Sequence, residues 1–396
     1  MKNYFLYIDA GTGALLINIV LALFASVTYY FRSLFFWVFN FDKTQNKKIN
    51  ELSLFSEGEQ YWNTFEPILN SLIQNKIKFN YFTMSYKDPA LLIENDYINS
   101  KYIGKGSIGF YRFSKIFSKF LITTTPNIGN KGFVLKKPKK VSNLIHVYHS
   151  IIGLPHYKTG ALDNYDSIII GGDYQIDPIR TIEKIRNLKK KKLYKLGIPY
   201  LDSLYEKKKI INSKNKTILI ASSWGAKGCF RVYGTDFIEE LSDLGYDIIL
   251  RPHPHSYLSE PDFIKKIRIR FKKRKNILWD DLTSPSNSMN KSHLLVSDSS
   301  SIRFDFAFIY ERPVVTLKID KENMTDFENQ YVKSSWEDEA EKIIGQTIVK
   351  SELNQLNEII KYNINNFNSK KIKELKEDTF YCFGESSKSI STFFKQ

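Results

Sequence analysis

Residues 294–307 read LLVSDSSSIRFDFA, and this stretch decides the fold class. Its apolar run, typical of a buried strand, ends at Val296, and the serines Ser299, Ser300 and Ser301 open a helix. Free N–H groups and hydroxyls at a helix start favour a bound phosphate, although a plain N-cap uses the same serines. The chain has no Gly-rich P-loop motif, so this arrangement would bind phosphate without one.

The same strand-then-helix pattern extends in both directions. Strands are expected at residues 217–223, 246–254 and 312–319, and helices at 236–244 and across 337–376. Earlier short apolar runs, bounded by turn residues, lie at residues 51–55, 79–85, 120–125, 144–150 and 167–172, with a helix at 59–76. We therefore predict an α/β protein with two Rossmann-type lobes, residues 48–205 and 214–396, and a ligand cleft beyond the strand ends.

Charge and cysteine content narrow the class of protein. The 396 residues include 58 Lys and Arg against 42 Asp and Glu, a net charge of +16. Such a chain suits nucleic acid, an anionic membrane surface or phosphate-rich small molecules. No nucleic-acid recognition motif is present and the lysines are scattered, so nucleic acid is disfavoured. The lysine run at residues 184–195 is expected to be a solvated helix face. Cys229 and Cys382 form no CxxC pair, which disfavours zinc and indicates a reducing compartment.

The N-terminal residues 1–42 form a predicted membrane segment. Residues 13–31 carry no charge, and about 20 apolar residues match a bilayer core. A signal peptide or a buried core helix would show a similar pattern. Basic residues such as Arg32 and Lys43 follow the span, so the positive-inside rule places the body on the cytoplasmic face of the inner membrane.

Histidines concentrate at two predicted strand ends. Of the six, His146, His149 and His156 follow one apolar run, and His253 and His255 follow another. A neutral imidazole at His149 suits a general base that deprotonates a hydroxyl, and Lys158 suits a phosphate. An ordinary strand–turn–helix is the plain alternative. A metal site is disfavoured because carboxylate partners are not evident.

The exit of the 246–254 strand carries a second candidate site. Arg251 and His253 are two apart on an extended segment, so they share one face and suit a diphosphate clamp. A surface turn is the alternative. Asp298 and Asp305 are further candidate cleft residues, and Asp305 would orient a ribose hydroxyl or have no role.

These segments, in this order, resemble the CDP-glycerol glycerophosphotransferase family, which builds teichoic-acid-type polymers. The resemblance rests on YHSIIGLPHYK at residues 148–158, Arg-Pro-His-Pro at 251–254, and the serine segment with Asp305. Tyr148, Ser150 and Ser299 depart from the family pattern, and these changes bear on substrate identity more than on reaction class.

The resemblance implies a GT-B-like fold, with the acceptor on the N-terminal lobe and the donor on the C-terminal lobe. His149 and His253 would be catalytic, while Arg251, Ser299, Ser300 and Ser301 would hold the diphosphate of CDP-glycerol or a similar CDP-alcohol. The acceptor would be a lipid-linked or envelope glycan, with no metal and no cofactor. Alternatives are a nucleotide-sugar glycosyltransferase and a non-enzymatic, membrane-tethered protein that binds anionic polymers.

Overall fold

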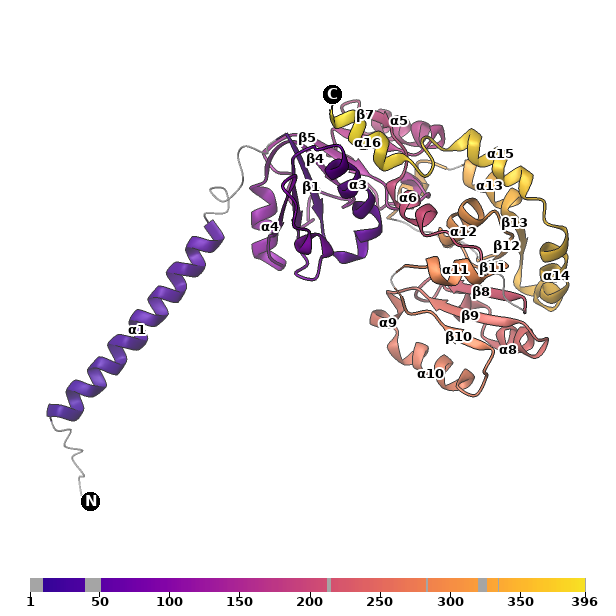
Figure 1. The fold of residues 1–396 in the computed structure, drawn as a ribbon, viewed down its shortest axis with the longest axis horizontal. Helices are drawn as coiled ribbons and strands as arrows, with labels where there is room; N and C mark the ends of the chain where they lie inside the picture. Colours follow the sequence, from indigo (N-terminus) through magenta and orange to yellow (C-terminus); the bar gives the residue numbers. More distant parts are fainter. Residues whose placement is uncertain are drawn as a thin grey trace, which may run out of the picture.

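The structure is a computed structural model of the chain. It describes residues 10–39, 51–211, 215–282, 284–319, 326–333 and 335–395, and the side chains of 10–16, 33–39 and 335 are outside the description. The described residues form a helix, α1 (Ala10–Phe39), followed by two α/β lobes and a set of C-terminal helices (Figure 1).

The N-terminal lobe is a parallel sheet of seven strands in the order β3-β2-β1-β4-β5-β6-β7. Most of its strands are runs of apolar residues, as expected for strands that helices cover on both faces. The strands are β1 (Leu52–Ser56), β2 (Phe79–Thr83), β3 (Ile98–Tyr102), β4 (Phe117–Thr123), β5 (Lys140–Val147), β6 (Ser167–Ile170) and β7 (Lys192–Lys195). The helices are α3 (Trp62–Gln74), α4 (Gly106–Ser114) and α5 (Ile176–Ile185), with short 3-10 turns η1 (Glu59–Tyr61), η2 (Pro89–Leu92), η3 (Leu154–His156) and η4 (Asp173–Gln175).

The C-terminal lobe is a parallel sheet of six strands in the order β10-β9-β8-β11-β12-β13. Its strands are β8 (Thr217–Ser222), β9 (Asp247–Pro252), β10 (Ile277–Trp279), β11 (Leu294–Ser297), β12 (Val314–Leu317) and β13 (Gly345–Ile348). Its helices are α7 (Cys229–Val232), α8 (Asp236–Asp243), α9 (Ser256–Ser259), α10 (Pro261–Phe271), α11 (Ser286–Lys291), α12 (Ile302–Tyr310), α13 (Ser335–Ile344), α14 (Leu356–Asn366) and α15 (Ser369–Thr379), with η5 (Glu328–Gln330) and η6 (Lys350–Gln355). The two lobes confirm the predicted pair of parallel α/β units.

Three segments at the junction of the lobes pack on the N-terminal lobe. Helix α6 (Pro199–Glu206) leads out of the N-terminal lobe and packs on α3. The segment 326–333 returns, because Val332 is buried in the core of the N-terminal lobe. Helix α16 (Ser386–Lys395) returns again onto α3, where Ile390 is fully buried among N-terminal core residues (Figure 1). The N-terminal lobe is therefore completed by parts of the chain distant in sequence.

Two predictions from sequence are wrong in detail. The lysine run at 184–195 is not a helix face, because α5 ends at Ile185 and β7 takes up Lys192–Lys195 as an edge strand paired with β6. Residues 337–376 are not purely helical, because Gly345–Ile348 pairs with β12 as the edge strand β13. Both sequences are polar, so neither shows the apolar run typical of a buried strand.

The predicted membrane segment receives no support. Within the part of the chain that the structure describes, no helix is both long and apolar enough to cross a membrane. Residues 1–9 and 40–42, and many side chains of α1, belong to that prediction but lie outside the described residues.

Candidate active site

His149 lies two residues beyond the carboxyl end of β5, on the N-terminal lobe. Its ring packs edge-on against the ring of Tyr61, with centroids 5.2 Å apart. Burial lowers the pKa of His149 to about 4, and its Nδ1 atom has no hydrogen-bond partner among the described residues. The imidazole is therefore neutral at pH 7 and has a lone pair available to accept a proton.

His146 has a different position from His149, although both follow the same sequence run. It is fully buried inside β5, with Nε2 3.2 Å from the hydroxyl of Tyr157. The rings of Tyr148 and Tyr165 pack on it at 5.0 and 5.2 Å. Burial keeps the pKa of His146 well below its ordinary value. His146 therefore organises an aromatic core beneath the site.

Glu57 is a half-buried carboxylate that the sequence analysis did not single out as a site residue. It follows β1 directly, so it lies at the same sheet edge as His149. Burial raises the pKa of Glu57, while a hydrogen bond from the Thr125 side chain opposes the shift. The pKa of Tyr61 is raised to about 12 by burial and by the Glu57 charge. Tyr61 therefore lies close to both Glu57 and His149.

His156 and Lys158 connect the two lobes. The His156 Nε2 atom lies 2.6 Å from the Glu337 carboxylate of α13. The Lys158 backbone forms an antiparallel bridge with Phe327, and its side chain is exposed. These contacts hold the loop after β5 against the C-terminal half of the chain.

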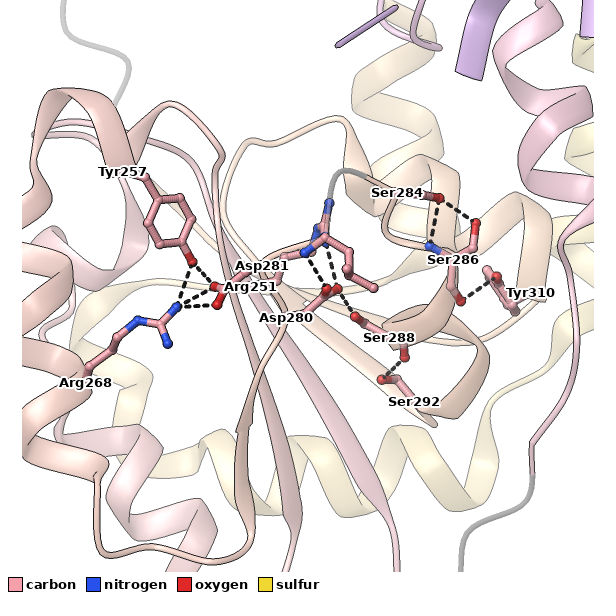
Figure 2. Close-up of polar contacts among 11 residues, drawn as sticks. Arg251, Tyr257, Arg268, Asp280, Asp281, Ser284, Ser286, Ser288, Ser292 and Tyr310 are labelled. Carbon is pink, nitrogen blue, oxygen red and sulfur yellow. Dashed lines mark hydrogen bonds and ion pairs between the residues drawn. The ribbon is translucent and has the colours of Figure 1, made fainter. Parts of the chain in front are cut away.

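Arg251 is held in place by a carboxylate at the end of β9. Its side chain is almost fully buried, and Nη1 donates to Asp280 Oδ2 at 2.7 Å. Ser288 of α11 donates to the same carboxylate (Figure 2). The adjacent Asp281 faces the other way and pairs with Arg268 at 2.5 Å. A buried arginine fixed by a carboxylate has few orientations left, which suits recognition of a planar anion.

His253 is exposed beyond the end of β9. Its Nδ1 accepts the backbone N–H of His255 at 3.1 Å, so the neutral ring carries its proton on Nε2. Desolvation lowers the pKa of His253, the charges of His255 and Arg251 add to the effect, and Asp298 opposes it. The exposed Trp224 packs edge-on against His255 with ring centroids 4.4 Å apart. His253 can therefore donate a hydrogen bond to an anion from an uncharged ring.

Asp298 links two loops through hydrogen bonds. Its carboxylate accepts from Ser223 N at 2.8 Å, Ser223 Oγ at 2.6 Å, Cys229 N at 2.8 Å and Ser300 N at 3.2 Å. The side chain is fully buried. These hydrogen bonds hold the loop after β8 against the loop after β11, so Asp298 fixes the relative position of the two loops.

The serine segment lies between β11 and α12. Ser297 is buried and donates to the carbonyl of Ala221 at 2.7 Å. Ser299 is exposed and Ser300 and Ser301 are half-buried, and within the described chain none of these three hydroxyls has a protein partner. Ser301 is the N-cap residue of α12, yet its side chain makes no capping hydrogen bond. The hydroxyls and the helix start are thus available to an external anion.

Asp305 is buried in the first turns of α12. One oxygen accepts the Tyr200 hydroxyl at 3.2 Å, and Oδ1 has no partner among the described residues. Burial raises the pKa of Asp305 to about 7, and the hydrogen bond from Tyr200 opposes this shift. Tyr200 belongs to α6, so this bond joins the interlobe helix to the serine segment.

Predicted and observed residues overlap in part. The structure places Arg251, His253 and Asp298 at the carboxyl ends of β9 and β11, which lie on either side of β8. It gives Lys158 a position on the interlobe bridge. Sequence reasoning missed Glu57, Asp280, Tyr200 and Trp224. Of these, only Glu57 had a local signal, because it stands in Ser-Glu-Gly directly after a predicted strand. No cluster of three or more metal-ligating side chains exists among the described residues.

Comparisons with known proteins identify the family of this chain and support its two-lobed fold. The model of the CDP-Glycerol:Poly(glycerophosphate) glycerophosphotransferase family matches residues 39–391. UDP-GlcNAc 2-epimerase from Neisseria meningitidis is 16% identical over 88% of this chain and 100% of its own, with a TM-score of 0.56. A putative UDP-N-acetylglucosamine 2-epimerase from Listeria monocytogenes is 10% identical over 88% and 96%, with a TM-score of 0.57. These structures share the two-lobed fold. A search of curated sequences found no match.

Proposed function

Because this chain belongs to the CDP-glycerol:poly(glycerophosphate) glycerophosphotransferase family, we propose that it transfers a glycerol-phosphate or related polyol-phosphate unit from a CDP-linked donor. The acceptor is a hydroxyl of a cell-envelope glycan or polymer, and CMP is the leaving product. The observation that carries this proposal is the pairing of a neutral, half-buried His149 on one lobe with a fixed arginine and unpartnered serine hydroxyls on the other.

The chemical step uses the two strand-end sites in different roles. His149 accepts the proton of the acceptor hydroxyl, and the oxygen attacks the phosphorus that carries the polyol. The bond from that phosphorus to the bridging oxygen breaks, and the electron pair leaves with CMP. Phosphoryl transfer depends mainly on positioning and on charge stabilisation. Both tasks fall to the C-terminal lobe in this mechanism.

The donor diphosphate fits the C-terminal strand ends. Arg251 supplies a permanent positive charge whose direction Asp280 sets. Ser300, Ser301 and the start of α12 supply neutral donors, and His253 adds one from Nε2. Ser299, which is exposed, is placed to contact the same group from the solvent side. In this proposal Asp298 makes no direct phosphate contact, because its buried carboxylate already accepts hydrogen bonds from two loops. Asp305 makes none either, because it is buried within α12.

The membrane association and cytoplasmic location expected from the sequence stay predictions. A CDP-linked donor suits a cytoplasmic body, since activated nucleotides are made there. Protease protection of the catalytic body in right-side-out and inverted vesicles would test the location.

The test is CMP release by the full chain. The protein is incubated with a glycan or polyol-phosphate acceptor and, in separate reactions, CDP-glycerol, CDP-ribitol or UDP-N-acetylglucosamine. Nucleotide products are separated by chromatography. We expect CMP only with a CDP-alcohol and only when acceptor is present, and none from His149→Ala. UDP release with the sugar nucleotide alone would establish a glycosyltransferase instead. Binding of anionic polymer without any nucleotide product would establish the non-enzymatic alternative.

A further inference from the structure

A second, strongly basic hollow lies on the opposite edge of the N-terminal sheet from His149. It opens where β5, β6 and β7 begin and has a volume of about 550 Å³. Its lining includes Asn143, Ser167, Arg180, Lys189, Lys190 and Lys192. His149 follows the carboxyl end of β5. The hollow is therefore separate from the reaction centre described above.

Two lysine runs distant in sequence meet at this edge. Residues 136–140 read KKPKK and lead into β5, while residues 189–192 read KKKK and lead into β7. Strand β6 pairs with both β5 and β7, which brings the two runs to one side of the sheet. Lys189, Lys190 and Lys192 are exposed, and none pairs with a carboxylate in the described part of the chain. The edge therefore carries a concentrated positive charge.

The nearby carboxylates are already occupied. Asp166 pairs with Lys137 at 2.8 Å and also accepts the Leu144 N–H at 2.8 Å. Glu183 pairs with Arg180 at 2.7 Å and accepts the Lys191 N–H at 2.7 Å. These acids hold the surrounding loops in place, and the three exposed ammonium groups remain uncompensated.

The floor of the hollow is ordered and polar. Lys191 is buried, and its ammonium donates to the carbonyls of Asp163 at 2.8 Å and Tyr165 at 3.0 Å, which anchors the lysine loop. Ser167 is 1% exposed, and its hydroxyl has no partner among the described residues. The Asn143 Oδ1 atom is likewise buried without a partner there. A buried polar group without a partner is costly, so such groups point to a bound polar ligand or water.

We propose that this hollow binds phosphodiester groups of the acceptor chain, as a second site that retains the growing polymer. The inference rests on the proposed function. The apolar lining is limited to the partly buried Leu193, which suits a hydrated polyanion better than a lipid surface. Asn143 and His149 are six residues apart along and just beyond one strand, or roughly 20 Å. An acceptor of several repeats can therefore reach both sites, whereas a single unit cannot.

Simultaneous binding at two sites predicts an effect that depends on acceptor length. Linked binding raises affinity without new contacts at the first site. The test variant is Lys189→Gln/Lys190→Gln/Lys192→Gln. The matched control is Lys265→Gln/Lys266→Gln/Lys272→Gln, which removes the same charge from exposed positions on and next to α10 in the other lobe. Thermal midpoints of both variants confirm folding.

Steady-state CMP release is measured with acceptors of one or two repeats and of more than ten repeats. We expect KM for the long acceptor to rise about fivefold to tenfold in the test variant only. The kcat with the short acceptor stays at the wild-type value. Equal KM values for wild type and test variant with the long acceptor would overturn the proposal, as would an equal change in the control. A wild-type chain without CMP release would instead contradict the proposed function.

A binding assay separates the hollow from the reaction. In a competition assay, inorganic polyphosphate displaces a labelled polyanion from the full chain, and fluorescence anisotropy measures the displacement. The test variant should weaken this binding and its salt dependence, while the control variant retains both. Vesicles with phosphatidylglycerol form the second arm. Loss of vesicle binding with unchanged polyphosphate binding would assign the surface to the membrane and refute the polymer site.

Discussion

The strand ends of the two lobes are built from the same parallel-sheet geometry but carry opposite chemistry. On the N-terminal lobe, His149 lies among tyrosines, and burial lowers its pKa to about 4. On the C-terminal lobe, Arg251 and Asp280 form a buried ion pair beside a serine-rich helix start. One edge keeps its proton acceptor neutral in a poorly solvated environment, and the other fixes charge and hydrogen-bond donors.

This difference indicates a division of tasks within one reaction. A neutral base needs an apolar neighbourhood, because solvation and nearby carboxylates would keep the pKa of the imidazole close to 6 or higher. A diphosphate needs the reverse, since its negative charge requires oriented donors and cations. A single lobe cannot satisfy both requirements at one point, and two lobes can. Each prediction below removes one element of this contrast.

The largest effect is expected from His149→Ala. Removal of a general base lowers kcat by about 10² to 10⁴. The control is His293→Asn, which alters a histidine that accepts the Thr217 N–H at 3.1 Å outside the site. Both are followed as CMP release. Because the pKa of His149 is about 4, the imidazole should stay unprotonated down to about pH 5. The wild-type kcat should therefore not fall through protonation of this base above that pH. If kcat falls by less than tenfold in His149→Ala, His149 is not the general base.

The next effect tests the fixed charge on the other lobe. Arg251→Ala leaves the buried Asp280 without its cation, so the free energy of unfolding should fall by about 3–5 kcal/mol. The double variant Arg251→Ala/Asp280→Ala should recover part of that loss but no activity. Denaturant unfolding and CMP release measure the two quantities. If the double variant regained turnover, Arg251 would serve stability alone.

The smallest effect concerns pH and Asp305. Its folded pKa of about 7 lies above the ordinary value of 3.8, so the folded state holds a proton that the unfolded state loses. The contribution of this extra proton to the free energy of unfolding is complete below about pH 4 and is lost as the pH rises to about 7. Asp305→Asn should thus match wild type at pH 4 and exceed its stability at pH 8 by roughly 2–4 kcal/mol.

Unfolding curves at several pH values test this difference, and the exposed Asp96→Asn provides the control. A constant offset between Asp305→Asn and wild type from pH 4 to pH 8 would show that burial does not set the protonation of this group. The same variant series in CMP release would show whether a rate change near pH 7 depends on Asp305.

Local pattern predicted the two lobes and most of the strands. Apolar runs at residues 217–223 and 294–297 became β8 and β11, because a buried parallel strand needs little beyond apolar residues. The polar edge strands β7 and β13 were missed, since an edge strand requires only one partner. Sequence order alone could not reveal which side chains meet.

Pairing across the fold was the part that could not be predicted. Asp280 lies 29 residues from Arg251, and Tyr200 lies 105 residues from Asp305. Nothing local distinguishes these partners from other acids and tyrosines. The same holds for Asp298, a motif residue whose carboxylate is occupied by loop donors. A motif identifies residues of interest, while three-dimensional packing decides what each one does.

The return of α16 to the N-terminal lobe has a consequence for protein synthesis. Ile390 belongs to the core that also contains Leu54 of β1, although more than 300 residues separate them. Domains often fold in order as they leave the ribosome. The first lobe of this chain cannot complete its core in that way, because α16 is translated more than 300 residues after β1. Until α16 is translated, the strands that have left the ribosome expose part of their apolar surface. We therefore expect this chain to depend on chaperones during translation.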